Sequence, residues 1–408
     1  MYDILIIGGG ASGMAAAISA LKAKPGISVA LVEKNNRVGK KILVTGNGRC
    51  NISNRYIDID RFHGSNPKFA LKALADINLD ETLRFFEELG MYPRYEEDKI
   101  FPNSLQASSI VDILRMGMGA QGVAEICDFD CTDISKKGDV FTLKSAKGQT
   151  LSARKVIVCA GGKASPKSGT DGSAYSLLKK FGHKMTKLYP SLVQIRCDSP
   201  YLVAMKGVKF DANVSIEVNG SIKKTEFGEL LFTDYGISGP PVFQLSRIAS
   251  VESSKGSEVY AIVDMLAHVD EYELYINLCT RNKDVPVESF FAGMFNRLLA
   301  QQLLKACGIK KFNTDASVID DDMMNLLAHT IKNWRFKITG TNSWDAAQVT
   351  AGGIVTDDFN PSTMESLLQK GLYAAGEILD IDGDCGGFNL QWAWSSGIIA
   401  GESCARSL

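Results

Sequence analysis

The chain has 408 residues, a formal net charge of −1 at pH 7, and 45% hydrophobic against 22% charged residues. This size allows two or three domains with cores of their own, and the nearly balanced charge provides no bulk attraction to nucleic acid or acidic membranes. No stretch reaches the ~18 apolar residues of a membrane span, and the first residues lack the basic segment of a signal peptide. Nine cysteines without C-x-x-C spacing argue against a disulfide framework or a zinc site. We therefore expect a cytoplasmic protein.

The first strand and turn organise the N-terminal part of the chain. Residues 2–7 form an apolar run of strand length that leads into the glycine-rich turn 8–13, whose spacing is G-x-G-x-x-G. A helical stretch, 14–23, and a second β-rich run, 28–32, follow and end at Glu33. The three glycines would permit the tight turn, the approach of a pyrophosphate and close helix packing, with the phosphates on the helix N-terminus and the ribose on Glu33. The pattern predicts a βαβ unit that binds a dinucleotide.

A second match to the glycine spacing lies at residues 117–122. It follows a helical segment and precedes a strand, which is the reverse of the order that phosphate binding needs. We therefore interpret it as a helix C-terminal turn.

Residues 45–51 (T-G-N-G-R-C-N) are dense in groups that turn sharply and donate hydrogen bonds. Such a loop suits a polar ligand, although a plain Asn-Gly surface turn remains the alternative. Asn47 and Arg49 could bind carbonyl or anionic groups, and Arg49 could equally be structural. Cys50 is the lone thiol of this loop, and a buried thiol is the more common fate of such a residue.

The following segments predict helices and then strands. Residues 66–89 have the apolar spacing of two helices, and 108–116 that of another. From residue 123 the period changes to two, which predicts a three-stranded meander at 123–134, 140–145 and 150–159.

Beyond residue 190 the sequence predicts an insertion, about 191–349, that begins with a small antiparallel sheet or barrel. Its turn signal is Asn219-Gly220, typical of a hairpin. The predicted strands are 192–197, 212–218, 222–225 and 230–233, and the predicted helices are 271–308 and 320–334.

The chain then returns to one more apolar strand, 372–377, a loop at 380–387 and a closing helix from Phe388 to about residue 406. The loop aspartates, at positions 380, 382 and 384, alternate like calcium ligands but lack the EF-hand glycine and distal acid, so we exclude calcium.

The two ends together have the organisation of FAD-binding proteins of the glutathione-reductase-like class, in which the terminal strand closes the first sheet. By that resemblance, Gly376 and Glu377 approach the ribityl-phosphate part of FAD. The helix that begins near Phe388 would aim its N-terminus at the N1–C2=O edge of the flavin, where the helix dipole favours negative charge.

Four stretches, 39–51, 232–240, 350–353 and 382–394, resemble a family of bacterial FAD flavoproteins that includes aminoacetone-oxidase-like and bile-acid-reductase-like members. The resemblance spans the chain and implies an α/β fold with a Rossmann-like FAD-binding domain, an inserted β-barrel and a small helical subdomain. Asp234 departs from the family, in which many members have His. The implied domains are 1–190 plus 350–408 for FAD, 191–264 plus 335–349 for the barrel, and 265–334 for the helices.

The candidate site residues come from these motifs and from the resemblance, and no metal is expected. The candidate cofactor-binding residues are Gly8, Gly10, Ala11, Ser12, Gly13, Glu33, Lys34, Lys41, Gly46, Asn47, Ala124, Ala160, Gly161, Gly162, Gly376, Glu377, Gly387, Phe388, Asn389 and Leu390. The candidate catalytic residues are Asn47, Arg49, Cys50 and Asn389, with Gln391 as a further polar group. The reactive ring should lie between the loops at 46–51 and 386–391.

The expected chemistry is hydride transfer from NAD(P)H through flavin N5 to an activated C=C bond of a small molecule. The chain has no second strand–GxGxxG–helix unit, so the nicotinamide would dock transiently, and a single loop cysteine argues against disulfide chemistry. One alternative is an amine or aminoketone oxidase that uses O₂, and a further one is a non-catalytic flavin-binding protein. Another is an enzyme that reduces uridine in ribosomal RNA, although the sequence contains no RNA-recognition motif, no aromatic–basic interleave and no basic excess. None of the four histidines lies in a motif.

Overall fold

The computed structural model describes residues 1–408, and the chain divides into two compact units. Unit 1 comprises Met1–Tyr189 and Gln348–Leu408, and unit 2 comprises Pro190–Ala347. The finer division of the insertion into a barrel domain and a helical subdomain stays a prediction.

The core of unit 1 is a sheet centred on β1 (Tyr2–Ile7), which pairs in parallel with its neighbours on both sides. The strand order is β7-β2-β1-β10-β9-β8, and β19 pairs in parallel with β10, so the strand near the C-terminus joins the sheet as predicted. Ile4, Leu5 and Ile6 are fully buried, because a parallel strand covered on both faces is apolar throughout. The other strands are β2 (Val29–Val32), β7 (Ala124–Ile126), β8 (Cys131–Lys137), β9 (Val140–Ser145), β10 (Thr150–Val158) and β19 (Leu372–Ala374).

The predicted strand at 123–134 is wrong, because this segment forms two strands that pair with different partners. β7 pairs in parallel with β2, whereas β8 pairs with β9 in the antiparallel meander. Between them Asp128 has φ +56°, a left-handed conformation that interrupts an extended chain.

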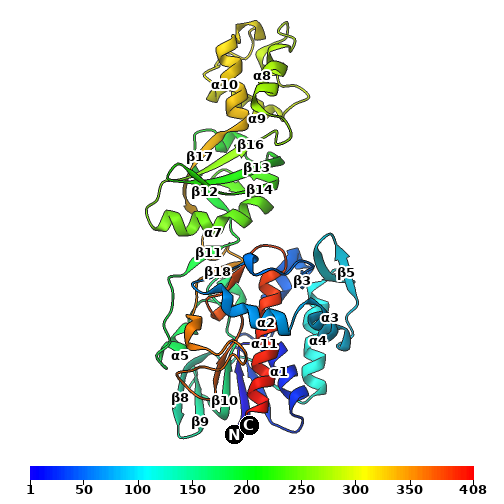
Figure 1. The fold of residues 1–408 in the computed structure, drawn as a ribbon, viewed down its shortest axis with the longest axis vertical. Helices are drawn as coiled ribbons and strands as arrows, with labels where there is room; N and C mark the ends of the chain where they lie inside the picture. Colours follow the sequence, from blue (N-terminus) through cyan, green and yellow to red (C-terminus); the bar gives the residue numbers. More distant parts are fainter. The chain divides into compact units, whose positions relative to one another are not determined.

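Two long helices, α1 (Ala11–Ala23) and α11 (Phe388–Arg406), pack along each other and lie side by side in Figure 1. Their close approach depends on glycine: a Cβ at Gly397 would lie 2.4 Å from Ser12 O, and one at Gly401 would lie 2.2 Å from Ala16 O. The remaining helices are α2 (Ala70–Asp76), α3 (Leu79–Glu88), α4 (Ala107–Ala120) and α5 (Tyr175–Lys179). The helices predicted within 66–89 and 108–116 are thus confirmed, and α4 ends just before Gly122, as expected for the second glycine match.

Short strands form two further small sheets in unit 1. β3, β6 and β5 form one small sheet, and β20 pairs with β4. Their bounds are β3 (Ser53–Asn54), β4 (Phe62–His63), β5 (Pro93–Glu96), β6 (Lys99–Pro102) and β20 (Asp382–Gly383), and β11 (Tyr189–Ser191) and β18 (Val349–Ala351) lie where the chain leaves and re-enters this unit.

Unit 2 contains a closed six-stranded barrel in the order β12-β15-β14-β13-β16-β17, as the short β runs predicted. Asn219 and Gly220 both have positive φ, +49° and +79°, at the turn between β13 and β14, which suits the two-residue hairpin that the Asn-Gly pair predicted. The strands are β12 (Ile195–Asp198), β13 (Lys209–Val218), β14 (Ser221–Phe232), β15 (Gly236–Ser238), β16 (Val259–Asp264) and β17 (Trp334–Thr341).

Several elements of unit 2 differ from the prediction, and the strands β15, β16 and β17 were not predicted. The runs 222–225 and 230–233 are one strand, β14. The helix predicted at 271–308 is two helices, α8 (Glu271–Cys279) and α9 (Arg297–Ala306), because Phe290 and Phe291 are buried in a non-helical segment between them. A helix over 240–254 was not predicted. The other helices are α6 (Leu202–Met205), α7 (Pro240–Ser254) and α10 (Asp321–Lys332). No helix of the chain is long and apolar enough to cross a membrane.

Candidate functional site

The turn between β1 and α1 has a packed side and an open side. A Cβ at Gly13 would lie 1.9 Å from Gly8 O, and a Cβ at Gly8 would lie 2.5 Å from Cys159 O, so these two glycines are required by packing. A Cβ at Gly10 would meet nothing within 4 Å. Gly10 is also the N-cap of α1, which has no side-chain cap and no acid in its first turn. The start of α1 therefore has no side-chain cap and has open space beside Gly10, as an incoming phosphate needs.

Glu33 lies directly after β2 and holds the glycine turn. Its Oε2 accepts a hydrogen bond from Gly9 N at 2.8 Å, and its Oε1 accepts from both Asn35 N and Asn35 Nδ2. Next to it, Lys34 Nζ pairs with Asp171 Oδ2 at 2.7 Å. Partial burial opposes ionisation of Asp171, but the hydrogen bonds from Lys34 and Ser173 prevail and lower its pKa to about 2. A contact between Glu33 and a ribose stays a prediction.

The end of β19 meets the segment that follows β2. Gly376 has φ +79°, and a Cβ there would lie 2.6 Å from Ser12 Oγ at the start of α1. Glu377 accepts hydrogen bonds from Lys41 Nζ at 2.6 Å and from Thr350 N at 2.9 Å. The structure thus brings four predicted cofactor residues, Ser12, Lys41, Gly376 and Glu377, to one place.

The residues after β10 lie against the same cluster. A Cβ at Gly162 would lie 2.3 Å from Thr350 Oγ1 and 2.9 Å from Glu377 Oε1. Gly161, which follows the half-buried Ala160, has φ +72°. At Gly161 and Gly162 the backbone itself therefore forms part of this edge, as a close approach to a ligand needs.

Ala124 does not lie at this edge. It is the first residue of β7 and pairs with Ala30 inside the sheet, whereas Ile126 O, at the end of β7, accepts the hydrogen bond from Glu33 N. The β7 residue beside Glu33 is Ile126, and the assignment of Ala124 as a cofactor contact stays a prediction.

α11 begins with a second uncapped N-terminus. Its N-cap, Gly387, has φ +101° and no side-chain cap, and the first turn, which includes Phe388 and Leu390, contains no acid. A Cβ at Gly387 would lie 2.5 Å from Ser53 O. Trp392 Nε1 donates to Gly376 O at 3.1 Å, so the buried tryptophan joins α11 to the end of β19.

The polar side chains of this helix start are already bonded within the protein. Asn389 Oδ1 accepts from Gly383 N at 2.8 Å and its Nδ2 donates to Gly383 O at 2.7 Å, so this amide shapes the preceding loop. Gln391 is fully buried, and its Nε2 donates to Ile77 O and Thr82 Oγ1. These bonds favour positioning functions for both residues rather than contact with a substrate.

The loop that contains Asn47 lies within Ile42–Gly48, where two short 3₁₀ pieces are separated by a kink at Thr45–Asn47, and Gly46 and Asn47 both have φ +55°. Asn47 is exposed and makes no hydrogen bond. Arg49 is fixed: its Nη1 donates to Glu96 Oε2 at 2.8 Å, and its guanidinium lies 4.4 Å from the ring centroid of Phe101.

Cys50 does not suit a catalytic role. Its side chain is fully buried, and burial raises its thiol pKa to about 12 although Thr45 opposes the shift. A buried thiol with a raised pKa is a poor source of the thiolate that would react. Its burial does not favour the expected part of Cys50 in the chemistry, which stays a prediction.

Sequence reasoning missed a histidine–carboxylate pair beside α11. His63 Nε2 lies 2.8 Å from Asp384 Oδ1, and Arg61 Nη1 lies 3.4 Å from Asp384 Oδ2. The two partners are 321 positions apart and meet because β4 pairs with β20, a contact that no local sequence pattern indicates.

The structure also gathers aromatic and basic side chains that are scattered in the sequence. Tyr56, Tyr92 and Tyr95 are exposed on the small β3-β6-β5 sheet or beside it, and the Arg55 guanidinium lies 4.5 Å from the Tyr95 ring centroid. The expectation that the chain lacks an aromatic–basic interleave therefore holds only along the sequence.

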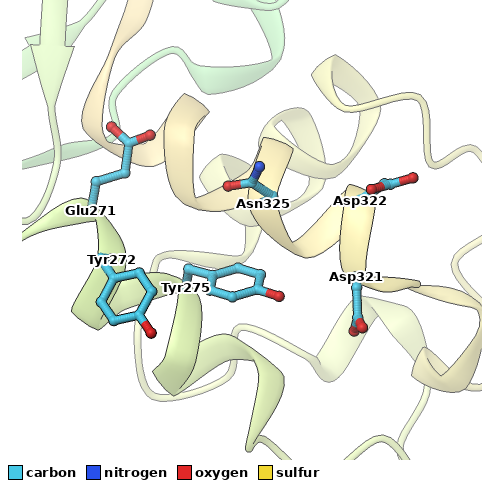
Figure 2. Close-up of a pocket in the computed structure, with 6 residues that line it drawn as sticks. All are labelled: Glu271, Tyr272, Tyr275, Asp321, Asp322 and Asn325. Carbon is cyan, nitrogen blue, oxygen red and sulfur yellow. The ribbon is translucent and has the colours of Figure 1, made fainter.

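Unit 2 has an open pocket of about 510 Å³ between α8 and α10. Figure 2 shows its tyrosines and carboxylates on these two helices. The acids Glu271, Asp321 and Asp322 all belong to the first turns of the helices, where the helix dipole favours them. Glu271 is also bonded to His329 Nδ1 at 2.9 Å.

Elsewhere in this unit, the exposed Asp234 pairs with Lys206 at 2.6 Å, which lowers the pKa of Asp234.

No group of three or more His, Cys, Asp or Glu side chains is arranged to hold a metal ion. The open space at Gly10 and the two uncapped helix starts, α1 and α11, fit a long anionic cofactor with phosphates at one helix and a polar ring edge at the other. The donor set therefore fits FAD.

Comparisons with known proteins agree with this fit. A family model described as the HI0933-like protein Rossmann domain matches residues 2–403. A 3-dehydro-bile acid delta(4,6)-reductase of Clostridium scindens is 38% identical over 411 residues, which cover 100% of both chains. A ribosomal RNA dihydrouridine synthase of Escherichia coli is 29% identical over 411 residues, which cover 100% of this chain and 98% of that protein.

Two solved structures share the fold at low sequence identity. A flavocytochrome c3 fumarate reductase in an open conformation gives a TM-score of 0.50 at 17% identity and covers 99% of this chain and 78% of that chain. A 3-ketosteroid delta1-dehydrogenase of Sterolibacterium denitrificans gives a TM-score of 0.50 at 12% identity and covers 100% of both.

Proposed function

This chain belongs to the HI0933-like family of FAD-binding Rossmann proteins and is an FAD-dependent oxidoreductase, and from that premise we propose that it passes a hydride from NAD(P)H through FAD to an activated C=C bond of a small molecule. The observation that carries the proposal is the 38% identity, over the whole of both chains, to a 3-dehydro-bile acid delta(4,6)-reductase. A double bond conjugated with a ketone is electron-poor and accepts a hydride at its far carbon. We propose a conjugated carbonyl compound as the substrate class.

We propose that FAD binds along the glycine turn and the two uncapped helix starts of unit 1. The N–H groups at the start of α1 would bind the pyrophosphate across Gly10, and Glu33 would bind the adenosine ribose. The start of α11 would face the flavin edge that becomes negative on reduction. Bound there, FAD would accept and donate a hydride, while the chain supplies orientation and electrostatics.

Anaerobic spectroscopy of the purified protein tests the electron donor. We expect the protein to bind FAD and its visible absorbance to bleach with NADPH or NADH, and then to return on addition of a 3-dehydro-Δ4,6 bile acid or 2-cyclohexen-1-one. Product analysis should show one C=C bond reduced for each nicotinamide oxidised.

Other outcomes of this experiment discriminate the alternatives. Absence of bleaching with both nicotinamides would contradict the reductase proposal. Bleaching by an amine or aminoketone, with reoxidation by O₂, would instead support the oxidase alternative. A Gly13→Ala variant that cannot form the glycine turn provides the cofactor-free control.

A second candidate is reduction of uridine in ribosomal RNA. Two relatives named ribosomal RNA dihydrouridine synthases, from Escherichia coli and Haemophilus influenzae, are each 29% identical over nearly the full length. The C5=C6 bond of uracil is conjugated with a carbonyl, so the same chemistry applies. The exposed tyrosines on and beside the small β3-β6-β5 sheet, of which Tyr95 lies against Arg55, support this candidate, since aromatic rings stack with unpaired bases.

A deletion strain tests this candidate. Loss of dihydrouridine from ribosomal RNA, restored by the wild-type gene but not by a Tyr92→Ala/Tyr95→Ala variant, would support it. Unchanged ribosomal RNA would remove it. The same double variant should still reduce 2-cyclohexen-1-one, which separates RNA contact from the chemistry.

A further inference from the structure

His63 is fixed in one orientation by its pairing with Asp384. β4 and β20 align His63 opposite Asp382, and the ring reaches the next carboxylate on the loop, with Nε2 at 2.8 Å from Asp384 Oδ1. The carboxylate can only accept, so Nε2 carries a proton and donates. Nδ1 makes no hydrogen bond, and the side chain is 29% exposed, so this nitrogen is available to a ligand and to water.

Asp384 is held on both sides by backbone contacts. Its N–H donates to Arg61 O at 2.9 Å, and its own carbonyl accepts from Asn389 Nδ2 at 3.3 Å. The carboxyl group is only 5% exposed. A buried carboxylate on a clamped backbone keeps its direction, and the His63 ring that bonds to it keeps its direction too.

The pair lies at the start of α11. Asp384 precedes the N-cap Gly387 by three residues, and Phe62, the neighbour of His63, packs edge-on against Phe388 with ring centroids 5.9 Å apart. The Arg61 guanidinium lies 6.0 Å from the same Phe388 ring. His63 and the helix start proposed for the flavin therefore belong to one packed cluster.

The other three histidines do not offer this arrangement. His183 is buried against Phe359, with Nε2 at 2.9 Å from Ser366 Oγ, and burial lowers its pKa. His329 and His268 belong to unit 2, and His329 is bonded to Glu271. His63 is the one partly exposed histidine of unit 1.

From this geometry we infer that His63, oriented by Asp384, is the catalytic acid that protonates the substrate; this inference rests on the proposed function. Reduction of a conjugated C=C bond adds a hydride, supplied by the reduced cofactor, to the carbon far from the carbonyl. The electron pair of the double bond moves toward the carbonyl, and the carbon next to the carbonyl must then take a proton. Nδ1 of the imidazolium ring gives that proton, and the neutral ring keeps its Nε2–H bond to Asp384 until solvent protonates it again.

A single-turnover experiment isolates this step from the nicotinamide reaction. The FAD enzyme is reduced anaerobically with light and EDTA, then mixed with a 3-dehydro-Δ4,6 bile acid or 2-cyclohexen-1-one, and the return of flavin absorbance is followed. His63→Gln should slow the return ~100-fold, the lower range of what a general acid contributes. Asp384→Asn should slow it ~10-fold by releasing the ring. His329→Gln, the matched histidine control in unit 2, should leave it unchanged.

Two readouts separate proton donation from a structural effect. Wild type and His63→Gln should have the same FAD content and thermal midpoint, and free imidazole should restore a large part of the rate to a His63→Ala variant, which a structural role does not allow. In ¹⁵N-histidine-labelled oxidised protein, the His63 signal should show protonation on Nε2, and Asp384→Asn should remove that preference.

The outcomes distinguish the two levels of the proposal. If no conjugated carbonyl probe reoxidises the wild-type enzyme, the proposed function fails and the inference falls with it. If the probes reoxidise wild type and His63→Gln at equal rates, or imidazole gives no rescue of a well-folded His63→Ala variant, the inference alone is overturned.

Discussion

Lys41 Nζ lies 2.6 Å from Glu377 Oε2, although the two residues are 336 positions apart. The ion pair joins the segment after β2 to the end of β19, and both side chains are about one-fifth exposed, at 21% and 20%. Since Glu377 also accepts the Thr350 N–H, this carboxylate connects three separate segments of unit 1.

Breaking this ion pair should destabilise unit 1. Lys41→Met leaves the half-buried Glu377 carboxylate without its cation, and we expect a loss of about 1–3 kcal/mol in the free energy of unfolding of the FAD-free protein. Glu377→Gln should cost less, because the amide oxygen still accepts from Thr350. Urea denaturation of both variants and of the double variant measures the coupling, and strictly additive effects would show that the pair contributes nothing.

Gly10 and Gly13 should respond differently to the same methyl group. Gly10→Ala adds a Cβ to open space, so the FAD-free protein should unfold at the same urea concentration while FAD binding weakens by about 10-fold or more, a loss of about 1.4 kcal/mol or more. Gly13→Ala collides with Gly8 O and should destabilise the FAD-free protein itself. Equal FAD affinity of wild type and Gly10→Ala, by fluorescence titration, would place the cofactor elsewhere.

The contact between α1 and α11 should depend on Gly401. A Cβ there would lie 2.2 Å from Ala16 O, a backbone atom that cannot move without shifting α1, so Gly401→Ala should cost about 1–3 kcal/mol. Gly119→Ala on α4 is the matched control, because its Cβ meets nothing within 4 Å and alanine favours a helix by about 1 kcal/mol. Thermal unfolding should therefore move in opposite directions for the two variants.

His183 should make stability fall in mild acid. Burial lowers its pKa in the folded protein, so the unfolded chain binds a proton first as the pH drops. The stability from the neutral ring is complete above the unfolded pKa of about 6.5 and is lost as the pH falls from there through the folded pKa, by up to about 1.4 kcal/mol per pH unit. His183→Gln should have a shallower slope between pH 6.5 and pH 5 in urea denaturation, and an unchanged slope would contradict this.

Cys50 should be inert in the folded protein. Its thiol is fully buried and has a pKa raised to about 12, so iodoacetamide at pH 8 should label it only after denaturation. Cys50→Ala should keep FAD and most of the turnover and lose about 1 kcal/mol of stability through packing. Rapid labelling of native Cys50, located by mass spectrometry, would restore it as a candidate for catalysis.

The sequence predicted what local patterns encode. The glycine spacing at 8–13, the helix from Phe388 and the Asn219-Gly220 hairpin are short-range signals, and the structure has each of them. The division of the predicted strand 123–134 into two strands at Asp128 could not be predicted, because apolar and polar residues alternate with the same period on both sides of it. The pairs His63–Asp384 and Lys41–Glu377 could not be predicted from the sequence, since only the completed sheet and its edge bring these segments together.

The packing of α1 against α11 also determines when this part of the core can form during synthesis. α1 leaves the ribosome early, but the helix that covers its small, apolar face is encoded last, so at ~5–20 residues per second that face waits roughly 20–80 s for its partner. The end of β19 and the start of α11 arrive in the same final interval. Under the proposed placement of FAD, a chain that ends before α11 should bind no cofactor and show no activity.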